Sequence, residues 1–375
     1  MRRPSETAHQ QAPAKFREAV FADHEQIVRL ESRYGLIAKS YDEWRHLWMG
    51  NPLYRTIQDA WSIGWVLEDE QGQIVGSMGN IPIPYELEGK PILAATGHNW
   101  VTEPAYRSAA LQLLDSVINQ RGVDLYVNST VTAASVAAVQ VFECDPVPVG
   151  RWDRSAVWYT HRQRYYEMRL RQEHWPLAKP LSYAVATPES LWKALTTTAL
   201  RAGDVEVSAC ASFDERFDDF WSELRRRHPR RLLAVRSREV LQWHHRYALL
   251  NGHLWIPAVL DGDGLAAYAT FQRYDRPEWG TRMRLVDFQS LDGTSELLPS
   301  LLSWALKRCR AESIHSLEVV GQWLGRGELL ETAATDPREM PTWKFFYRAN
   351  TPALATSLKP PEVWAPSLYD GDASL

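Results

Sequence analysis

Cysteine, long apolar runs and surplus positive charge are all scarce in this chain of 375 residues. The three cysteines lie far apart and no Cys-x-x-Cys pair occurs, which excludes a disulfide framework and a cysteine-based zinc site. No apolar run approaches the length of a membrane span, and the polar N-terminus is no secretory signal. The net charge of −4 gives no overall positive surface for binding a long nucleic acid. We therefore expect a soluble, cytoplasmic protein that has neither a metal site nor a membrane partner.

What is present is the composition of a folded protein, with 45% apolar and 23% charged residues. The length suits two domains rather than one. In the tail, Asp370 and Asp372 flank a glycine, and the simpler interpretation is a solvated acidic segment, since two aspartates alone do not make a metal site. Five segments are predicted: a disordered arm over 1–14, an N-terminal domain over 15–171, a linker over 172–204, a C-terminal domain over 205–350 and a tail over 351–375.

The stretch from Lys90 to Phe142 organises the chain. An apolar run bounded by turns, Ile92 to Val101, predicts a buried strand. After a turn marked by proline comes a helix, then a second strand over Val123 to Ser129 and an alanine-rich helix over Thr132 to Phe142. The predicted order is therefore strand, basic turn, helix, strand, helix.

The turn between the first strand and its helix is the most informative part of this stretch. The first N–H groups of a helix lack internal partners and lie at the positive end of its dipole, which makes a helix start an anion site. The small residues Ser108, Ala109 and Ala110 let a ligand approach the backbone, and Arg107 adds a positive charge. This pattern favours a bound diphosphate; the alternative is a surface loop with a solvated arginine.

The same element order, with the motif Val101-x-x-Pro104-x-Tyr106-Arg107, resembles the central motif of the GCN5-related N-acetyltransferases. The resemblance implies an α/β (α+β) protein whose two tandem domains each hold a mixed, mostly antiparallel sheet flanked by helices. It also implies an N-acyltransferase that moves an acyl group, usually acetyl, from acetyl-CoA or another acyl-CoA to an amine of a small-molecule or sugar-linked acceptor. An acyl carrier protein is an alternative donor, because it presents the same pantetheine arm.

The motif departs from the family pattern at its glycines. Ala110 and Gln112 stand where two glycines would follow the arginine, and Ser108 stands where a further glycine is common. This departure favours a catalytically silent binding module as an alternative function. A second alternative is a tandem aminoacyltransferase of the Fem type. The C-terminal tail of this chain resembles the tails of such enzymes. Such an enzyme uses charged tRNA, and the basic stretches Arg162–Arg171 and Arg225–Arg231 would supply its groove; otherwise both are solvated faces.

The second half of the chain repeats the plan of the first, which supports two tandem domains. A strand over Met283 to Leu291 precedes a helix over Ser295 to Arg310, as the central strand precedes its helix in the first half. Each unit is expected to close with a strand of its own, Asp153 to Tyr159 in the first and Lys344 to Arg348 in the second. Asp292 replaces the basic turn and would repel a diphosphate, so we expect the second domain to shape the acceptor site.

The resemblance also implies which residues hold the donor. A backbone N–H near Trp100 or Val101 would polarise the thioester carbonyl, as in an oxyanion hole. Asn128, at the end of the next strand, would bond the pantetheine amides. The phosphates would rest on the turn formed by Arg107, Ser108, Ala109, Ala110 and Leu111.

His98 is the first candidate for the base that deprotonates the acceptor amine. Its pKa ordinarily lies near neutral pH, and it is on the strand that would hold the thioester. Glu143, after the alanine-rich helix, and Asp287, on the matching strand of the second half, are the other candidates. The simpler interpretation of His98 is a core histidine, and that of Glu143 is a solvated side chain.

Alternation along the central strand offers a geometric test of this assignment. Side chains of a strand point to opposite faces in turn, so His98 and Trp100 should share one face while Asn99 and Val101 share the other. If the face of His98 does not line the site, then Asn99 is the polar residue in reach and His98 belongs to the core.

Overall fold

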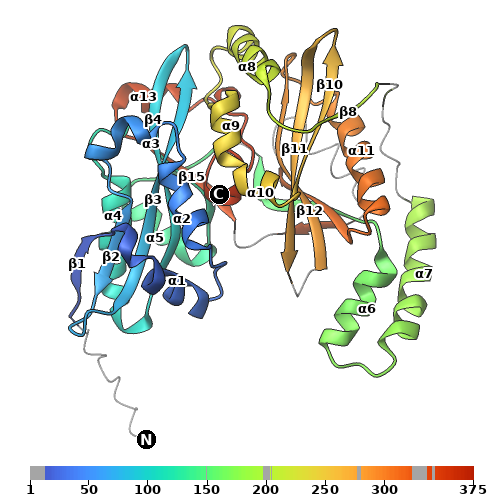
Figure 1. The fold of residues 1–375 in the computed structure, drawn as a ribbon, viewed down its shortest axis with the longest axis horizontal. Helices are drawn as coiled ribbons and strands as arrows, with labels where there is room; N and C mark the ends of the chain where they lie inside the picture. Colours follow the sequence, from blue (N-terminus) through green and yellow to red (C-terminus); the bar gives the residue numbers. More distant parts are fainter. Residues whose placement is uncertain are drawn as a thin grey trace, which may run out of the picture.

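The structure, a computed structural model, describes residues 13–148, 150–196, 203, 205–276, 280–322, 336–339 and 343–375. Two mixed β-sheets form the two halves of the molecule, and helices pack against them (Figure 1). The predicted α/β class, with two mixed sheets flanked by helices, is confirmed. The predicted N-terminal arm lies outside the described residues, except for residues 13 and 14.

The first sheet has the strand order β1-β2-β3-β4-β5-β15-β6, and β9 pairs with β3. Its neighbours are antiparallel except for β4 and β5, which run parallel. The strands are β1 Lys15–Glu18, β2 Gly64–Glu68, β3 Ile74–Leu87, β4 Lys90–Thr102, β5 Leu125–Val131, β6 Asp145–Pro146, β9 Leu233–Ala234 and β15 Lys344–Ala349.

One helix of the first half, α2, begins at a clear local sequence signal. At the start of α2 the Oγ of Ser40 accepts the N–H of Glu43, and the Glu43 carboxylate accepts the N–H of Ser40 at 3.0 Å. This reciprocal cap is one that the sequence signals, because Ser40 is followed by a glutamate three residues later. The helices are α1 His24–Arg33, α2 Tyr41–Met49, α3 Tyr54–Ile57, α4 Ala110–Ile118 and α5 Val136–Val141, with 3-10 turns at Phe21–Asp23, Gln58–Ala60, Pro104–Ala109 and Ala133–Ser135.

The second sheet has the strand order β14-β7-β13-β12-β11-β10-β8, and only β12 and β13 run parallel in it. Its strands are β7 Arg151–Tyr159, β8 Ser208–Cys210, β10 Leu254–Asp261, β11 Gly264–Arg276, β12 Gly280–Ser290, β13 Ser316–Gln322 and β14 Asp336–Glu339. The helices that follow in the chain are α8 Glu215–Arg227, α9 Arg238–His244, α10 Arg246–Leu250, α11 Leu298–Ala311 and α13 Pro352–Ser357.

The two halves exchange a strand, and on this point the sequence prediction was wrong. The strand β7, predicted to close the first unit, pairs with β13 of the second sheet, where Trp158 is opposite Leu317. The strand β15, predicted to close the second unit, pairs with β5 of the first sheet, where Tyr347 is opposite Val127. An apolar sequence pattern identifies a strand but does not indicate which other strand it pairs with. The predicted domain limits stay a prediction, although each sheet takes strands from both predicted domains.

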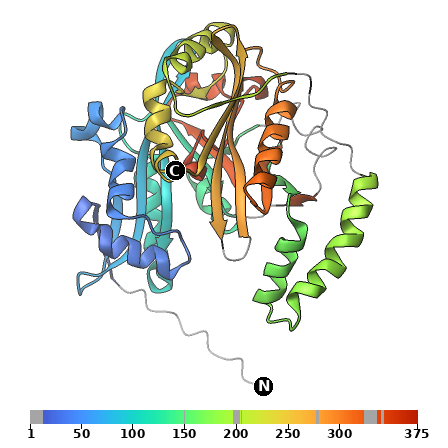
Figure 2. The same ribbon diagram turned by 45° about the vertical axis from the view of Figure 1, so that its right-hand side comes forward.

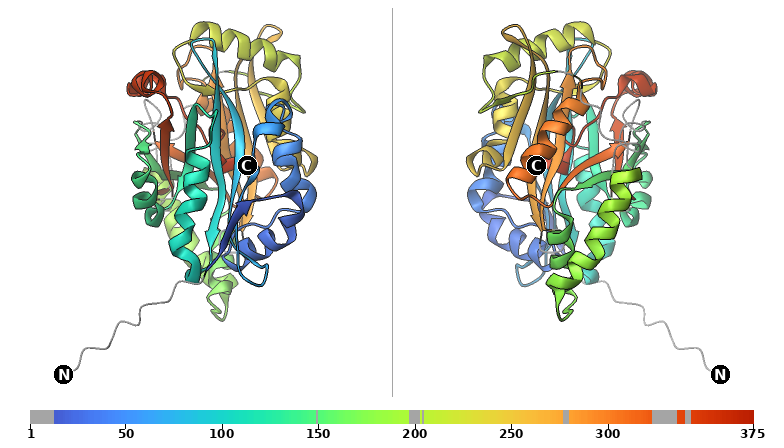
Figure 3. Two further views of the ribbon diagram at one scale, coloured as in Figure 1. Left: turned by 90° about the vertical axis from the view of Figure 1, so that its left-hand side faces the viewer. Right: turned by 90° about the vertical axis from the view of Figure 1, so that its right-hand side faces the viewer.

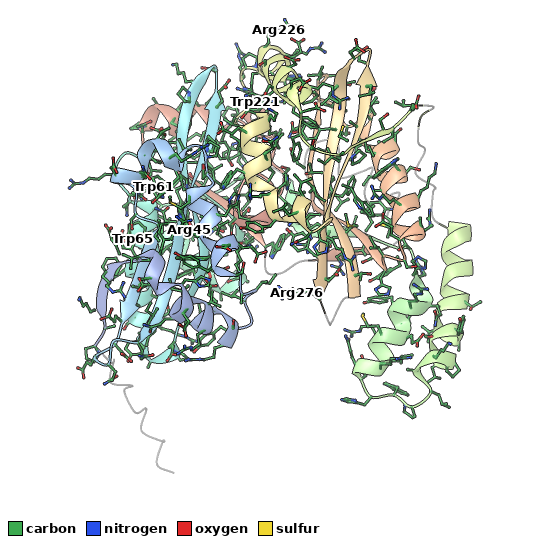
Figure 4. All side chains as sticks on the ribbon, in the orientation of Figure 1. Arg45, Trp61, Trp65, Trp221, Arg226 and Arg276 are labelled. Atoms are coloured by element: carbon green, nitrogen blue, oxygen red, sulfur yellow. The ribbon has the colours of Figure 1, made fainter. Side chains whose placement is uncertain are left out.

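An apolar core lies between the two sheets and takes side chains from both, among them Tyr85 of β3 and Tyr268 of β11. Two further cores lie beyond it, one in each half of the molecule. Figure 4 marks Trp61 and Trp65 in the first half and Trp221 on α8, and all three are buried. These tryptophans therefore act as packing anchors.

Two helices, α6 Arg162–Gln172 and α7 Ala178–Thr196, project from the second half as a hairpin (Figure 2). They take up most of the stretch predicted as a linker, where α7 begins at Ala178. Within the described parts of the chain, no helix combines the length and the apolar character needed to cross a membrane.

The C-terminal tail is buried, and the chain ends near the middle of the molecule (Figure 3). Tyr369 and Asp370 are both buried, and the hydroxyl of Tyr85 donates to the carbonyl of Asp370 at 2.6 Å. The interpretation of this segment as a solvated acidic tail was therefore wrong.

Candidate functional site

The strands β4 and β5 run side by side in parallel and then separate. Their register pairs Ala94–Thr96 with Leu125–Val127 and ends there, although β4 continues to Thr102 and β5 to Val131. A cavity of about 160 Å³ lies between the separated strand ends. Its wall consists of Gly97, Asn99 and Trp100 from β4, Tyr126, Asn128, Thr130 and Val131 from β5, and Leu36, Met78, Leu114, Thr132, Ser135, Val139 and Asp372.

A bulge in β4 shapes this wall. Asn99 has a φ of 52°, in the left-handed region, and the pairing with β3 shifts around it, from Gly79 opposite His98 to Ser77 opposite Val101. An extra residue of this kind bends a strand and interrupts its alternation. The neighbours Asn99 and Trp100 therefore both line the cavity, against the expected alternation.

The indole of Trp100 adds an unused donor to the cavity wall. Its Nε1 is buried and has no hydrogen-bond partner among the described residues. Buried polar atoms normally have a partner, so a buried donor without one, on the wall of a cavity, points to a ligand group as its partner.

His98 lies on the other side of β4. It lines a separate, small cavity of about 10 Å³ together with Glu31, Trp44 and Ser77. Burial, assisted by the positive charge of Lys39, lowers the pKa of His98 to about 3. An imidazole with that pKa is neutral and only weakly basic at physiological pH. The structure thus shows the second of the two expected arrangements, with His98 in the core and Asn99 in reach, and it does not support His98 as the base.

Glu31 of α1 shares this small cavity with His98, and sequence reasoning missed it. Burial raises the pKa of Glu31 to about 7, against the opposing effects of a hydrogen bond with Asn99 and the charge of Lys39. Asn99 thereby connects the buried carboxyl to the main cavity. One signal was present in the sequence: Glu31 follows Ile27 by four residues, which places a carboxyl on the apolar face of the helix.

Tyr126 and Asp372 bring two further ionisable groups to the wall of the main cavity. Burial raises the pKa of the Tyr126 phenol, whose oxygen accepts the Nδ2–H of Asn128 at 3.3 Å. The Asp372 carboxylate accepts the N–H and the hydroxyl of Ser129, both at 3.0 Å, and the hydroxyl of Thr130. Burial raises the pKa of Asp372 despite these bonds.

Sequence reasoning missed both groups, for different reasons. Tyr126 could have been found, because alternation puts it on the same face of β5 as Asn128, which was predicted. Asp372 gave no such signal, because it reaches β5 from the far end of the chain.

The predicted phosphate turn has a different local structure from the one expected. Residues Pro104–Ala109 form a 3-10 helix that leads into α4, and the N–H of Ala110 donates to the carbonyl of Arg107. A 3-10 helix uses its N–H groups in bonds of this kind, so a cradle of free donors is not present. The side chains of Arg107 and Ser108 are exposed.

The residues predicted to bind the donor are therefore only partly brought together. Trp100 and Asn128 line the cavity, whereas the side chain of Val101 is buried in the core of the first half. The predicted stretch Arg107–Leu111 does not line the cavity, although Leu114, one turn further along α4, does. The donor-binding roles stay predictions.

The other two candidates for the base lie away from the cavity. Glu143 is exposed, in an open surface depression that also contains Asp145. Asp287 is buried in the second sheet, where its carboxylate accepts Nε–H and Nη2–H of Arg236 at 2.7 and 3.1 Å. Burial disfavours the charged form of Asp287, but Arg236 outweighs this effect and keeps the pKa below its ordinary value. The main cavity thus contains none of the three predicted bases.

The basic stretch proposed for tRNA includes side chains that serve the fold. Arg225 is buried, and its guanidinium donates to the carboxylate of Glu86 at 2.9 Å and to the carbonyl of Arg231 at 2.8 Å. Arg226 forms an ion pair with Glu223. The Fem-type alternative stays a prediction. Across the described ranges, no three His, Cys, Asp or Glu side chains are placed to hold a metal ion together.

Solved structures share this fold, whereas no family description and no curated protein matches the sequence. A GCN5-related N-acetyltransferase from Kribbella flavida matches with a TM-score of 0.54 at 10% identity, covering 90% of this chain and 71% of that one. The N-myristoyltransferase of Saccharomyces cerevisiae with bound myristoyl-CoA gives 0.56 at 12% identity, covering 93% and 88%. A probable N-acyltransferase of unknown function from Enterococcus faecalis gives 0.53 at 9% identity, covering 90% and 73%.

At identities this low, the similarity shows the fold alone. The matches extend over both sheets, since each covers at least 90% of the chain. The predicted resemblance to the GCN5-related fold is therefore confirmed for the whole molecule and is not limited to the central motif.

Proposed function

We propose that this chain, which has the tandem fold of the GCN5-related N-acetyltransferases, is an N-acyltransferase that moves an acyl group from a CoA-type thioester to an amine. The observation that carries the proposal is the separation of β4 and β5, which opens a cavity with polar groups on both walls. The myristoyl-CoA bound by the yeast structural neighbour supports acyl-CoA as the donor. We take the acceptor to be an amine on a small molecule or a sugar.

The separated strands suit the pantetheine arm of such a donor. Beyond Thr96 and Val127 the facing strand edges no longer pair with each other, and the amides of pantetheine are the groups that a free strand edge can bond. Gly97 leaves room for the Met78 side chain on this wall, since a Cβ there would lie 2.1 Å from Cε of Met78; the Tyr126 hydroxyl, at 3.6 Å, would be in ordinary contact.

The transfer needs one group that accepts a proton and one that donates a proton. The amine nitrogen attacks the thioester carbonyl, a C–N bond forms, the C–S bond breaks, and the amine proton must leave while the thiolate gains one. Asp372 is suited to accept the amine proton, because its raised pKa makes the carboxylate a stronger base. Tyr126 is assigned as the donor to the thiolate because its hydroxyl lies on the cavity wall and is protonated; its raised pKa makes it a weak acid, so proton transfer would follow the build-up of charge on the sulfur.

The test is an acyl-transfer assay on the full chain, with acyl-CoAs of increasing length and a panel of amines, in which thiol release and product mass are measured. Asp372→Asn retains the shape of the side chain and should lower turnover by roughly 100- to 10,000-fold while leaving CoA binding nearly intact. Asp145→Asn, an exposed residue outside the cavity, is the matched control. Full turnover in Asp372→Asn would remove the assigned base.

A silent binding module is the second candidate, and the internal bond of the Ala110 N–H favours it. Binding to the folded state alone raises the melting temperature by mass action. A melting temperature that rises with CoA or an acyl-CoA, together with no transfer to any amine of the panel, would favour this second candidate.

A further inference from the structure

The α6–α7 hairpin has an unusual distribution of apolar side chains. Ala178, Ser182 and Ala186 recur every four residues on α7 and are buried, and the hydroxyl of Ser182 accepts Nε2–H of Gln163 on α6 at 3.0 Å. Small residues therefore form the inner face of the hairpin. Leu181 and Val185 have the same spacing one position earlier and are exposed. These two larger apolar side chains thus face the solvent.

Exposed apolar side chains are concentrated at this hairpin. Of the fifteen large hydrophobic residues that are exposed in the described part of the chain, five lie between residues 175 and 185. Trp175 and Leu177, in the turn at the tip, are 53% and 74% exposed. A cluster of this density on a soluble surface indicates a contact site, whereas scattered exposed residues do not.

The charge of the hairpin is opposite to that of the molecule. Residues 162–187 contain four arginines and one lysine against two glutamates, a net charge of +3, whereas the whole chain carries −4. Arg164 and Lys179 are exposed on it. The hairpin stands away from both sheets in Figures 1 and 2, and α6 has 11 residues, so the tip projects by roughly 16 Å. This exceeds the Debye length of about 8 Å at physiological salt, so the positive charge dominates at the tip.

We propose that the α6–α7 hairpin docks this protein peripherally on a bilayer of anionic phospholipid. Trp175 and Leu177 enter the headgroup region and the exposed Lys179 lies over the phosphates, while Arg164, about 12 Å back along α6, adds to the attraction. Trp at the interface with basic residues beside it is the side-chain pattern that such surfaces favour. Peripheral docking needs no spanning helix, so the lack of long apolar runs in the sequence does not oppose it. A second copy of the chain suits the hairpin less well, because two hairpins of the same charge would repel each other.

The experiment is sedimentation of the full chain with vesicles of phosphatidylcholine alone or of equal parts phosphatidylcholine and phosphatidylglycerol. We expect partitioning at least tenfold stronger onto the anionic vesicles at about 0.1 M salt, weakening towards about 1 M as the charges are screened. The double variant Trp175→Ala/Leu177→Ser should lose roughly tenfold or more of this binding, since it removes the inserted apolar area. Leu250→Ser, a residue 68% exposed elsewhere, should bind as the wild type does.

Two further measurements keep the test decisive. Arg164→Gln/Lys179→Gln alters only exposed charges and should weaken binding to anionic vesicles even if the apolar variant does not fold. Light scattering without lipid tests whether the hairpin instead binds a second copy of the chain. Equal binding to both vesicle types, unchanged binding in both double variants, or a dimer that the apolar variant converts to a monomer would each overturn the proposal.

Discussion

The two sheets contain the same parallel strand pair, yet the space beside that pair differs. In the first sheet β4 and β5 separate onto a cavity. In the second sheet β12 and β13 pair over Arg282–Leu285 and Ser316–Val319, and further along β12 the Asp287 carboxylate binds Arg236. Arg236 also binds Asp370, at 2.8 Å. The same topology therefore holds an open site in one half and a filled ionic cluster in the other.

The buried carboxyl groups of the two halves differ in the same sense. Burial raises the pKa of Glu31 and of Asp372 in the first half. In the second half burial opposes the ionisation of Asp287 and Glu318, but neighbouring arginines outweigh it and lower both pKa values. Carboxyl groups with raised pKa values thus lie at both cavities of the first half, Asp372 at the main cavity and Glu31 beside His98 in the small one, while fixed ion pairs support the second half. The tail serves both halves, because Asp370 faces the cluster and Asp372 faces the cavity.

The largest effect is expected from breaking the filled cluster. Arg236→Met leaves Asp287 and Asp370 buried without their counter-charge, and removing one partner of a buried ion pair costs about 3–5 kcal/mol. Urea unfolding measures the change in the free energy of unfolding. Arg55→Met, which breaks the exposed pair with Glu239, is the control and should cost less than about 1 kcal/mol. Equal small losses of unfolding free energy in both variants would show that the Arg236 cluster does not stabilise the fold. The contrast with the open cavity would then be wrong.

The second prediction concerns Glu31 and the pH dependence of stability. Its pKa is raised from an ordinary 4.5 to about 7, so the folded state binds this proton more tightly than the unfolded state. The corresponding stability is complete below about pH 4.5 and is lost as the pH rises through about 7. At pH 8 the ionised carboxyl should cost the folded state on the order of 3 kcal/mol, since one pKa unit equals about 1.4 kcal/mol.

Glu31→Gln removes this titration, so its unfolding free energy relative to wild type should rise between pH 4.5 and pH 8. Chemical unfolding at closely spaced pH values measures it. Glu25→Gln, on an exposed position of the same helix, is the control and should show no such rise. Parallel pH profiles of wild type and Glu31→Gln would mean that Glu31 ionises normally and that the contrast between the two halves is wrong.

Local signals account for what the sequence predicted well. Ser40 and Glu43 lie three residues apart and form their cap within one turn, so the start of α2 needs no information from the rest of the chain. The apolar runs that became β4 and β12 identify buried strands in the same way. These signals suffice for the class of fold and for most elements.

What the sequence did not predict depends on distant partners. The pairing of β15 with β5 joins segments more than 200 residues apart, and nothing in either strand names the other. Asp372 enters the cavity by the same kind of long-range contact. The bulge at Asn99 interrupts the alternation of side chains along β4, and it therefore places Asn99 beside Trp100 at the cavity. The elements were therefore predictable, whereas the residues gathered at the site were largely not.

The third prediction concerns a substitution that partly fills the open cavity. In Gly97→Ala the new methyl group meets the end of the flexible Met78 side chain, which can move, and approaches the Tyr126 hydroxyl. We expect CoA affinity to fall about tenfold, or about 1.4 kcal/mol, with little loss of stability. Calorimetry with CoA and a melting curve measure the two quantities. Gly264→Ala, where the methyl group meets only ordinary contacts, is the control. An unchanged affinity would place the donor outside the cavity.

The smallest effect is expected at Arg107, where the two halves differ in their helix starts. In the second half the Asp292 carboxylate already accepts the N–H of Thr294 at 2.8 Å, whereas in the first half Arg107 is exposed. With the Ala110 N–H bonded internally, a phosphate near Arg107 would interact mainly with its charge, in water. Such contacts contribute roughly 0.3–1 kcal/mol and are screened by salt. Arg107→Glu should therefore weaken CoA binding several-fold at low salt and much less at high salt, as measured by calorimetry.

Pantetheine, which lacks the diphosphate, separates this charge effect from a general disturbance of the site. Its affinity should not change in Arg107→Glu, and Arg246→Glu, an exposed arginine on α10, should alter neither ligand. If pantetheine and CoA lost affinity equally, the variant would act through the shape of the cavity, and the phosphates would have to bind elsewhere. If neither lost affinity, the turn before α4 would be no more an anion site than the acidic turn before α11, and the halves would differ only in the cavity itself.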